Sequence, residues 1–182
     1  MKKIMIGGAM FVLIAQYAQA SGSDESLSKG LIGAEVGGMH IDAKNDLGIS
    51  FDDTYSAGAI KIGAENDSWR FLAQYNIIEN GHDNGVKVSN DLYTVHLDYL
   101  VTSWRKGEWS TMPFIGVNGG YLSYHYGSSK ENGFAGGAEA GMILSKKSFE
   151  MEVGIRYLDT NVNLVDSLTS VYVGFNFKVD SE

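Results

Sequence analysis

The stretch that decides the fold is FEMEVGIRYL, residues 149–158, in which apolar and polar residues alternate. One face of an extended strand would carry the residues at odd positions, which are Phe149, Met151, Val153, Ile155 and Tyr157. The opposite face would carry Glu150, Glu152, Gly154 and Arg156. Period two is the pattern of a β-strand whose faces meet different environments. The stretch therefore predicts a strand with one apolar and one charged face.

Seven further runs of about ten residues follow the same template. The clearest are 69–77, 93–101 and 170–177, and the weaker ones are 31–41, 55–64, 112–124 and 134–144. Glycine blurs the weaker runs. In the run 112–124, both Phe114 and Ile115 fit the apolar face, and a β-bulge there would reconcile them. Eight such strands predict an all-β domain.

Composition excludes several classes of protein. The 182 residues contain no cysteine, so a disulfide framework, a thiolate zinc site and a cysteine nucleophile are excluded. A net charge of −8 with three arginines argues against a nucleic-acid partner, which needs a clustered basic surface. We expect one folded domain rather than a disordered chain or a coiled coil.

The first twenty residues have the form of a cleavable signal peptide. Lys2 and Lys3 precede an apolar segment, and Ala18-Gln19-Ala20 is a small-x-small cleavage site. The apolar segment is too short for a membrane anchor, which needs about 20 residues. We therefore predict a signal peptide over 1–20 and a mature domain over 21–182, with its strands at about 29–177. The mature chain would carry 12 basic and 22 acidic residues.

Three features favour a membrane barrel over a soluble periplasmic β-protein, which stays the alternative fold. The first is a signal peptide combined with the absence of cysteine, which indicates bacterial export without the disulfides common in small secreted domains. Aromatic residues fall at both sets of strand ends, as in the girdles of outer-membrane barrels. One set is Trp69, Tyr99, Phe149 and Phe177, and the other is Tyr75, Tyr93, Tyr121 and Tyr157. The links 65–68 and 145–148 are short, whereas 42–54, 79–91, 125–133 and 159–167 are longer and polar. Short inner and long outer links are typical of such barrels, although the inner link 102–111 is longer than that rule prefers.

These residues resemble the small eight-stranded outer-membrane β-barrels, the family of the OmpA transmembrane domain, OmpX and the opacity proteins. The resemblance rests on architecture, on the last strand VYVGFNF (171–177), and on PFIGVNGGY (113–121). It implies an antiparallel up-and-down transmembrane barrel in the bacterial outer membrane, reached by the general secretory route. It also implies an assembly signal formed by Val171, Val173, Phe175 and Phe177. Family members often end on an aromatic residue, whereas here Phe177 is followed by 178–182.

The resemblance also implies partners. These are outer-membrane lipids and lipopolysaccharide, the barrel assembly machinery and periplasmic chaperones during biogenesis, and host or surface ligands reached through the outer links. No cofactor and no nucleic acid is expected.

The predicted inward faces carry many charged side chains. An eight-stranded barrel has an interior that side chains can fill, so these charges need pairing. We predict a structural ion-pair network with Arg70 and Arg156 as hubs, since a guanidinium can bridge two carboxylates. Its members are Glu35, Lys61, Arg70, His96, Asp98, Glu139, Glu150, Glu152 and Arg156. The alternative is a gated ion path or a proton-responsive site around His96.

Two further kinds of site are weakly indicated. Ser123 and His125, with Glu139 on the next strand, resemble the catalytic set of lipid A deacylases. The Ser-x-His order is reversed, and the alternation turns Glu139 inward, away from Ser123. His96 and Asp98 are too few for a metal site. The acids Asp52, Asp53 and Asp83, the last next to His82, could bind calcium only weakly. We expect no catalytic residue and no metal.

The leading functional hypothesis is therefore a non-enzymatic outer-membrane barrel whose surface loops serve envelope integrity or adhesion. The alternatives are a small porin-like channel and, with less support, a lipid A-modifying enzyme.

Overall fold

The computed structural model describes residues 29–44, 50–78, 81–83, 86–126 and 129–179. In this part of the chain no helix is long and apolar enough to cross a membrane. The predicted signal peptide lies outside the described residues.

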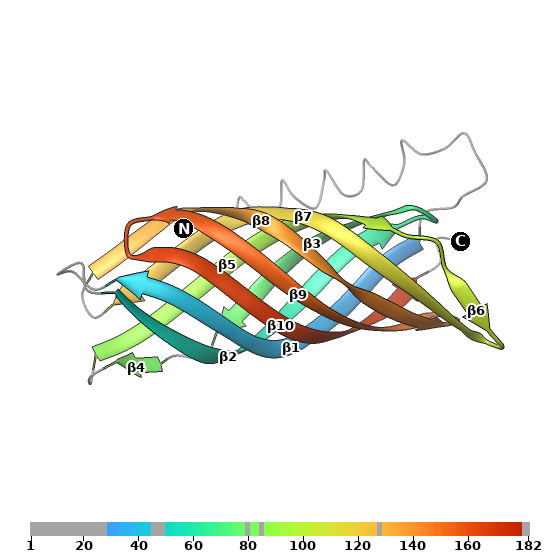
Figure 1. Cartoon of the computed structure of the whole chain (residues 1–182), viewed down its shortest axis with the longest axis horizontal. Helices are drawn as coiled ribbons and strands as arrows, with labels where there is room; N and C mark the ends of the chain where they lie inside the picture. The colour runs from blue at the N-terminus through green and yellow to red at the C-terminus, as the bar shows by residue number, and fades with distance from the viewer. Residues whose placement is uncertain (1–28, 45–49, 79–80, 84–85, 127–128, 180–182) are drawn as a thin grey trace.

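Ten antiparallel strands are present in the described residues (Figure 1). All of them except the short β4 and β6 form the wall of a closed barrel, and we call these eight barrel strands the staves. Their bounds are β1 Lys29–Lys44, β2 Ser50–Glu65, β3 Trp69–Ile78, β4 Gly81–Asp83, β5 Val86–Leu100, β6 Trp104–Lys106, β7 Trp109–Tyr126, β8 Ser129–Lys146, β9 Phe149–Val162 and β10 Val165–Val179. Each stave pairs with the next along the chain, and β1 pairs with β10 from Gly30↔Val179 to Ala43↔Val165. The predicted all-β, eight-stranded up-and-down barrel is confirmed.

The barrel has two chemically different ends. We call the end where β1 begins and β10 finishes the inner end, after the predicted periplasmic orientation, and the opposite end the outer end. The β2–β3, β6–β7 and β8–β9 turns lie at the inner end, on the right in Figure 1. Strands β1, β3, β7 and β9 finish at the outer end.

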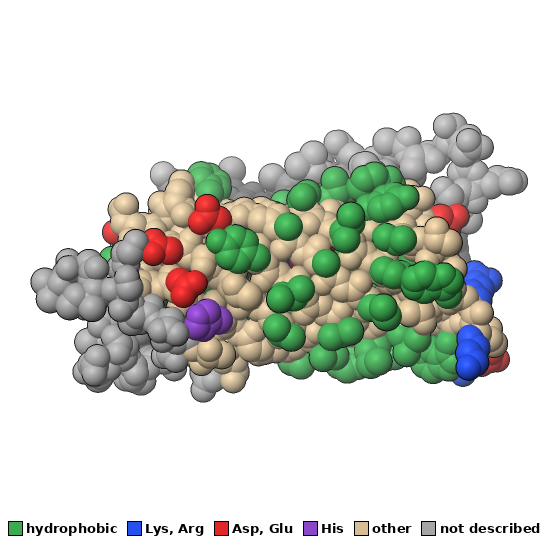
Figure 2. Space-filling model, in the orientation of Figure 1, with side chains coloured by type: hydrophobic (Ala, Val, Ile, Leu, Met, Phe, Trp, Pro, Cys, Tyr) green, Lys and Arg blue, Asp and Glu red, His purple; other side chains and the backbone are tan. Residues whose placement is uncertain are grey.

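Alternation holds along the staves as the sequence predicted. On β9, exposed and buried residues alternate from Met151 to Asp159, and Glu150, Glu152 and Arg156 face the lumen. The exposed apolar residues form a band around the outside of the barrel, and Figure 2 shows its near side. Aromatic pairs lie at both edges of the band: Trp69–Tyr99 at the inner edge and Tyr75–Tyr93 at the outer edge. An exposed apolar band of this kind favours a hydrocarbon environment.

The expected long outer loops are wrong. The strands continue into them: β1 reaches Lys44, β2 starts at Ser50, and β9 and β10 are joined by a turn at Asn163 and Leu164. The inner link 102–111 is also partly strand, since β6 pairs with the start of β7. In these extensions the polarity of the two faces is reversed, since Ile41 and Ala43 are buried in the lumen while polar residues such as Asp159 face outward. The pattern that identified the strands therefore ends while the backbone ladder persists.

The expected bulge near Phe114 and Ile115 is also wrong. The pairing of β7 with β5 and with β8 runs without a register shift through both residues. Phe114 is 1% exposed in the lumen, whereas Ile115 is 59% exposed outside. The register shifts at the β1–β10 and β9–β10 pairings lie instead near Asp42 and Val165. Phe114 belongs inside because its ring packs under a guanidinium, as described next.

Candidate functional site

Arg70 on β3 organises one half of the charged lumen. Its Nε donates to Asp98 Oδ2 on β5 at 2.9 Å, and its Nη1 donates to Glu152 Oε2 on β9 at 2.6 Å. The guanidinium carbon lies 4.7 Å from the centre of the Phe114 ring, a cation–π distance. One arginine thus joins β3 to β5 and β9 by hydrogen bonds and to β7 by its ring contact.

Arg156 on β9 organises the other half. Its Nη1 and Nη2 donate to the two carboxylate oxygens of Glu35 on β1, at 3.0 and 3.3 Å. Its Nε donates to Glu139 Oε2 on β8 at 2.8 Å. The guanidinium lies 4.5 Å from the Tyr172 ring centre, and the Tyr172 hydroxyl donates to Glu139 at 3.3 Å. Charged, forked donors of this kind make the strongest protein hydrogen bonds.

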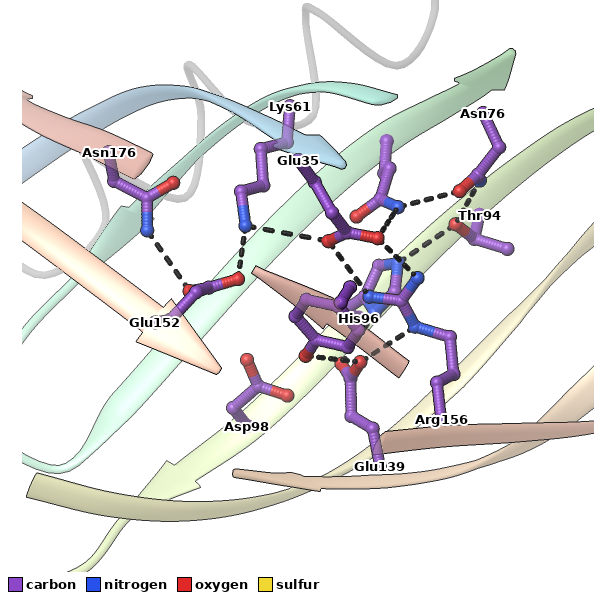
Figure 3. A network of polar contacts seen from close by, with 12 residues as sticks. Glu35, Lys61, Asn76, Thr94, His96, Asp98, Glu139, Glu152, Arg156 and Asn176 are labelled. Carbon is purple, nitrogen blue, oxygen red and sulfur yellow. Dashed lines mark hydrogen bonds and ion pairs between the residues drawn. The ribbon is translucent and has the colours of Figure 1, made fainter. Parts of the chain in front are cut away.

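Lys61 on β2 joins the two halves. Its ammonium group contacts Glu152 and lies 3.6 Å from Glu35 Oε2 (Figure 3). The connected cluster contains three basic side chains, Lys61, Arg70 and Arg156. It contains four carboxyl groups, which are Glu35, Asp98, Glu139 and Glu152. None of these seven residues is more than 6% exposed.

His96 is part of the same cluster. Its Nδ1 lies 2.5 Å from Glu139 Oε1, and its Nε2 lies 2.8 Å from Thr94 Oγ1. Amide side chains extend the chain of contacts: Gln74 Nε2 donates to Glu35 at 3.2 Å and to Asn76 Oδ1 at 2.7 Å. Both ring nitrogens of His96 thus contact buried protein groups.

Eight of the nine predicted network residues meet in this cluster, and the ninth lies apart from it. Glu150 is buried at the inner end, where Lys178 Nζ lies 2.8 Å from Glu150 Oε1 and 2.5 Å from Glu65 Oε1. Sequence reasoning missed Lys178 and Glu65. Their alternation with the inward residues of β10 and β2 was the signal that could have found them.

An apolar layer fills the lumen between the charged cluster and the outer end. Sequence reasoning missed this layer, although its residues have the inward parity of the charged positions. Its members are Met39, Ile41, Ala43, Tyr55, Ile78, Leu92, Leu122, Tyr124, Ala135, Leu158, Val162, Leu164, Val165 and Leu168. Leu92 and Leu122 are completely buried. The lumen therefore has an ion-paired layer at mid-height and an apolar plug toward the outer end.

Over the residues that it describes, the structure shows neither a catalytic arrangement of the Ser123, His125 and Glu139 set nor a metal site. Glu139 bonds to Arg156 and His96 inside the barrel, while Ser123 lies opposite Asp91 and Asn132. The side chains of Asp52, Asp53, His82 and Asp83 lie outside the described part of the structure. Among the described residues, no group of three His, Cys, Asp or Glu side chains is placed to hold a metal ion.

No family model and no curated protein matches this sequence. Solved structures do match its fold. The crystal structure of Neisserial surface protein A (NspA) superposes with a TM-score of 0.57 at 16% identity, covering 81% of this chain and 96% of that one. The solution structure of outer membrane protein H (OprH) from P. aeruginosa gives 0.53 at 21% identity, covering 80% and 98%. The chain has the fold of the small outer-membrane β-barrels.

A further match is the crystal structure of the outer membrane enzyme PagL, with a TM-score of 0.47 at 11% identity, covering 81% of this chain and 98% of that one.

The last stave, β10, exposes all four residues of the predicted assembly signal. These are Val171, Val173, Phe175 and Phe177. Their role in assembly stays a prediction.

Proposed function

We propose that this chain is a non-enzymatic, non-conducting barrel of the bacterial outer membrane that acts through its surfaces, in envelope integrity or in contact with external partners. The observation that carries the proposal is the filled lumen. Lys61, Arg70 and Arg156 are paired across the middle, and the apolar plug lies between them and the outer end. Water avoids an apolar, close-packed layer, so the barrel offers no path for ions.

The route to the membrane is part of the same proposal. We expect the segment 1–20 to direct export through the secretory pathway and to be removed. Periplasmic chaperones and the barrel assembly machinery would then receive the chain, the latter through β10. Lipids and lipopolysaccharide would surround the exposed apolar band, whose residues are contributed by every stave.

The outer hairpins are the parts best placed for external contact. They extend the sheet rather than leave it, so they present backbone-ordered surfaces on a rigid scaffold. Exposed acids lie at this end of the barrel, on the left in Figure 2. Beside them lies the half-buried Asp42, which accepts a hydrogen bond from Ser167 at 2.7 Å. An acidic rim favours basic or cation-bridged partners.

The filled lumen predicts that the refolded mature protein produces no stepwise conductance in a planar lipid bilayer. A porin of known conductance, inserted under the same conditions, is the positive control. Folding is checked beforehand by gel mobility with and without boiling, since a folded barrel in detergent shifts on heating, and insertion is checked by co-flotation of the protein with lipid vesicles. Reproducible conductance steps from the heat-shifting protein would contradict the non-conducting assignment.

Contact through the outer end predicts that shortening its hairpins weakens surface binding or barrier function. The full chain is expressed in a non-adherent laboratory bacterium, and each outer connection is shortened in turn, starting with residues 45–49. Binding to host cells and entry of a normally excluded dye are measured. Asp67→Asn, in the exposed β2–β3 turn at the opposite end of the barrel, is the control. If no shortened variant changes either readout while all still fold, the surface role is wrong.

A further inference from the structure

The β6–β7 hairpin projects beyond the barrel at the inner end (Figure 1). All three residues of β6 are exposed, and the turn between the strands contains Gly107 at a φ of 64°. The hairpin carries two tryptophans, Trp104 at 61% and Trp109 at 40% exposure. Large exposed aromatic side chains are expensive in water but favourable at a membrane interface.

The pairing register places cations on the lipid-facing side of this hairpin. Phe114 is inside the barrel, so Trp109, an odd number of residues away on β7, faces outward. Lys106 pairs with Trp109, and Trp104 pairs with Thr111, so both β6 residues share that outward face. From the neighbouring β8, Lys146 places its Nζ 5.4 Å from the centre of the Trp109 ring. These cations therefore adjoin the inner edge of the apolar band.

The two neighbouring turns are strongly basic within an acidic chain. The segments 104–109 and 146–149 contain Arg105, Lys106, Lys146 and Lys147 but one acid, Glu108, which pairs with Lys146 at 2.8 Å. Their net charge is thus +3, against −8 for the whole sequence. Figure 2 shows the same polarity, with Lys and Arg at the inner end and a group of acids toward the outer end.

Lys147 holds one of these charges at a strained backbone position. Its φ of 54° is left-handed, and it is the sole non-glycine residue with positive φ in the described part of the chain. Glycine or asparagine would fit a two-residue hairpin turn at lower conformational cost. A strained lysine where glycine would suffice indicates that its side chain is used.

We propose that these six residues, Trp104, Arg105, Lys106, Trp109, Lys146 and Lys147, form an inner-rim patch that binds the phosphate headgroups of anionic phospholipids in the inner leaflet. The tryptophan rings lie against the acyl-chain boundary while the cations reach the phosphates. A phospholipid is favoured over an anionic polymer such as peptidoglycan, because Lys106 and Lys146 share the outward face with Trp109 and the apolar band.

The chain supplies its own probe for this site. Its three tryptophans, Trp69, Trp104 and Trp109, all lie at the inner end. The mature protein is reconstituted in bilayers of phosphatidylcholine with a fraction of bromine-labelled lipid, which quenches tryptophan on contact. Quenching by labelled phosphatidylglycerol is compared with quenching by labelled phosphatidylcholine. We expect at least about fivefold preferential contact with the anionic lipid, which is the ratio that corresponds to about 1 kcal/mol from a single cation near a membrane surface.

The test variant is the triple R105Q/K106Q/K147G, which leaves Lys146 and its contacts intact. Glycine at 147 relieves the strained φ, so the change there is not expected to weaken the fold. The matched control is K44Q/K87Q/K130Q, which removes the same charge from strands at the outer end. We expect the test variant to lose the preference and the control to keep it. Raising ionic strength from about 0.1 to about 1 M should also reduce it in the wild-type protein.

Three results would overturn the proposal. The first is equal quenching by both lipids in the wild-type protein. The second is an undiminished preference in a test variant that still shifts on boiling. The third is co-sedimentation with purified peptidoglycan sacculi that depends on these cations, without any lipid preference, which would assign the patch to the cell wall instead.

Discussion

Arg156→Met is expected to destabilise the barrel by about 3–5 kcal/mol, the usual cost of removing one partner from a buried ion-paired group. Arg156 supplies three hydrogen bonds, two to Glu35 and one to Glu139. Both carboxylates are buried, so neither can replace the guanidinium with bulk water. The measurement is the free energy of unfolding in urea, in detergent micelles, followed by tryptophan fluorescence.

Arg105→Met is the matched control, because Arg105 is exposed at the inner rim. It should change the unfolding free energy by no more than about 0.5 kcal/mol, as is usual for surface positions. Adding Glu35→Gln and Glu139→Gln to Arg156→Met should recover a large part of the loss, since the orphaned charges are then gone. Equal effects of the two single arginine substitutions would show that the cluster is not a structural hub.

Gly137→Ala is the second change with a large expected effect, on the order of 1–3 kcal/mol or more, the range for overpacking a filled interior. Gly137 on β8 pairs with Leu158 on β9. A Cβ atom there would overlap the backbone carbonyl oxygen of Tyr157 and lie 3.0 Å from Leu158 Cα. Backbone atoms in a ladder cannot move aside without lengthening their hydrogen bonds, so the two staves must separate.

The neighbouring residue is the control for this prediction. Gly136→Ala places its Cβ no closer than 3.7 Å to another atom, the Asn118 carbonyl oxygen, and faces the outside of the barrel. We expect it to unfold like the wild-type protein. Urea unfolding and the heat-dependent gel shift distinguish the two variants. If the two substitutions lower the free energy of unfolding equally, the close approach of β8 and β9 is not the reason that glycine is needed at position 137.

The alternation in the sequence was enough to predict the staves and the residues facing the lumen. Side-chain direction in a strand depends on position alone, so the parity of Arg70, His96 and Glu152 could be read from a few neighbours. The same rule did not predict the apolar plug, because apolar residues were expected on the outward face, whereas Leu92 and its neighbours lie inside. It also failed at the outer hairpins, because the apolar residues there, such as Ile41 and Ala43, face the lumen and the polar ones face outward, the reverse of the pattern in the membrane-facing band.

The sequence by itself thus determined the strand number, the inward charges and the resemblance to small outer-membrane barrels, because these follow from local period and composition. The tertiary structure alone decided which charges meet. Arg156 and Glu35 are 121 residues apart, and they pair only because β1 closes on β10 in one register. A shift of that register would change every contact across the lumen. Closure of the barrel also set Phe114 under Arg70, because β3 and β7 flank β5 and their inward side chains meet only in the closed lumen. The basic turns of the inner rim come together through the register of β7 with β8.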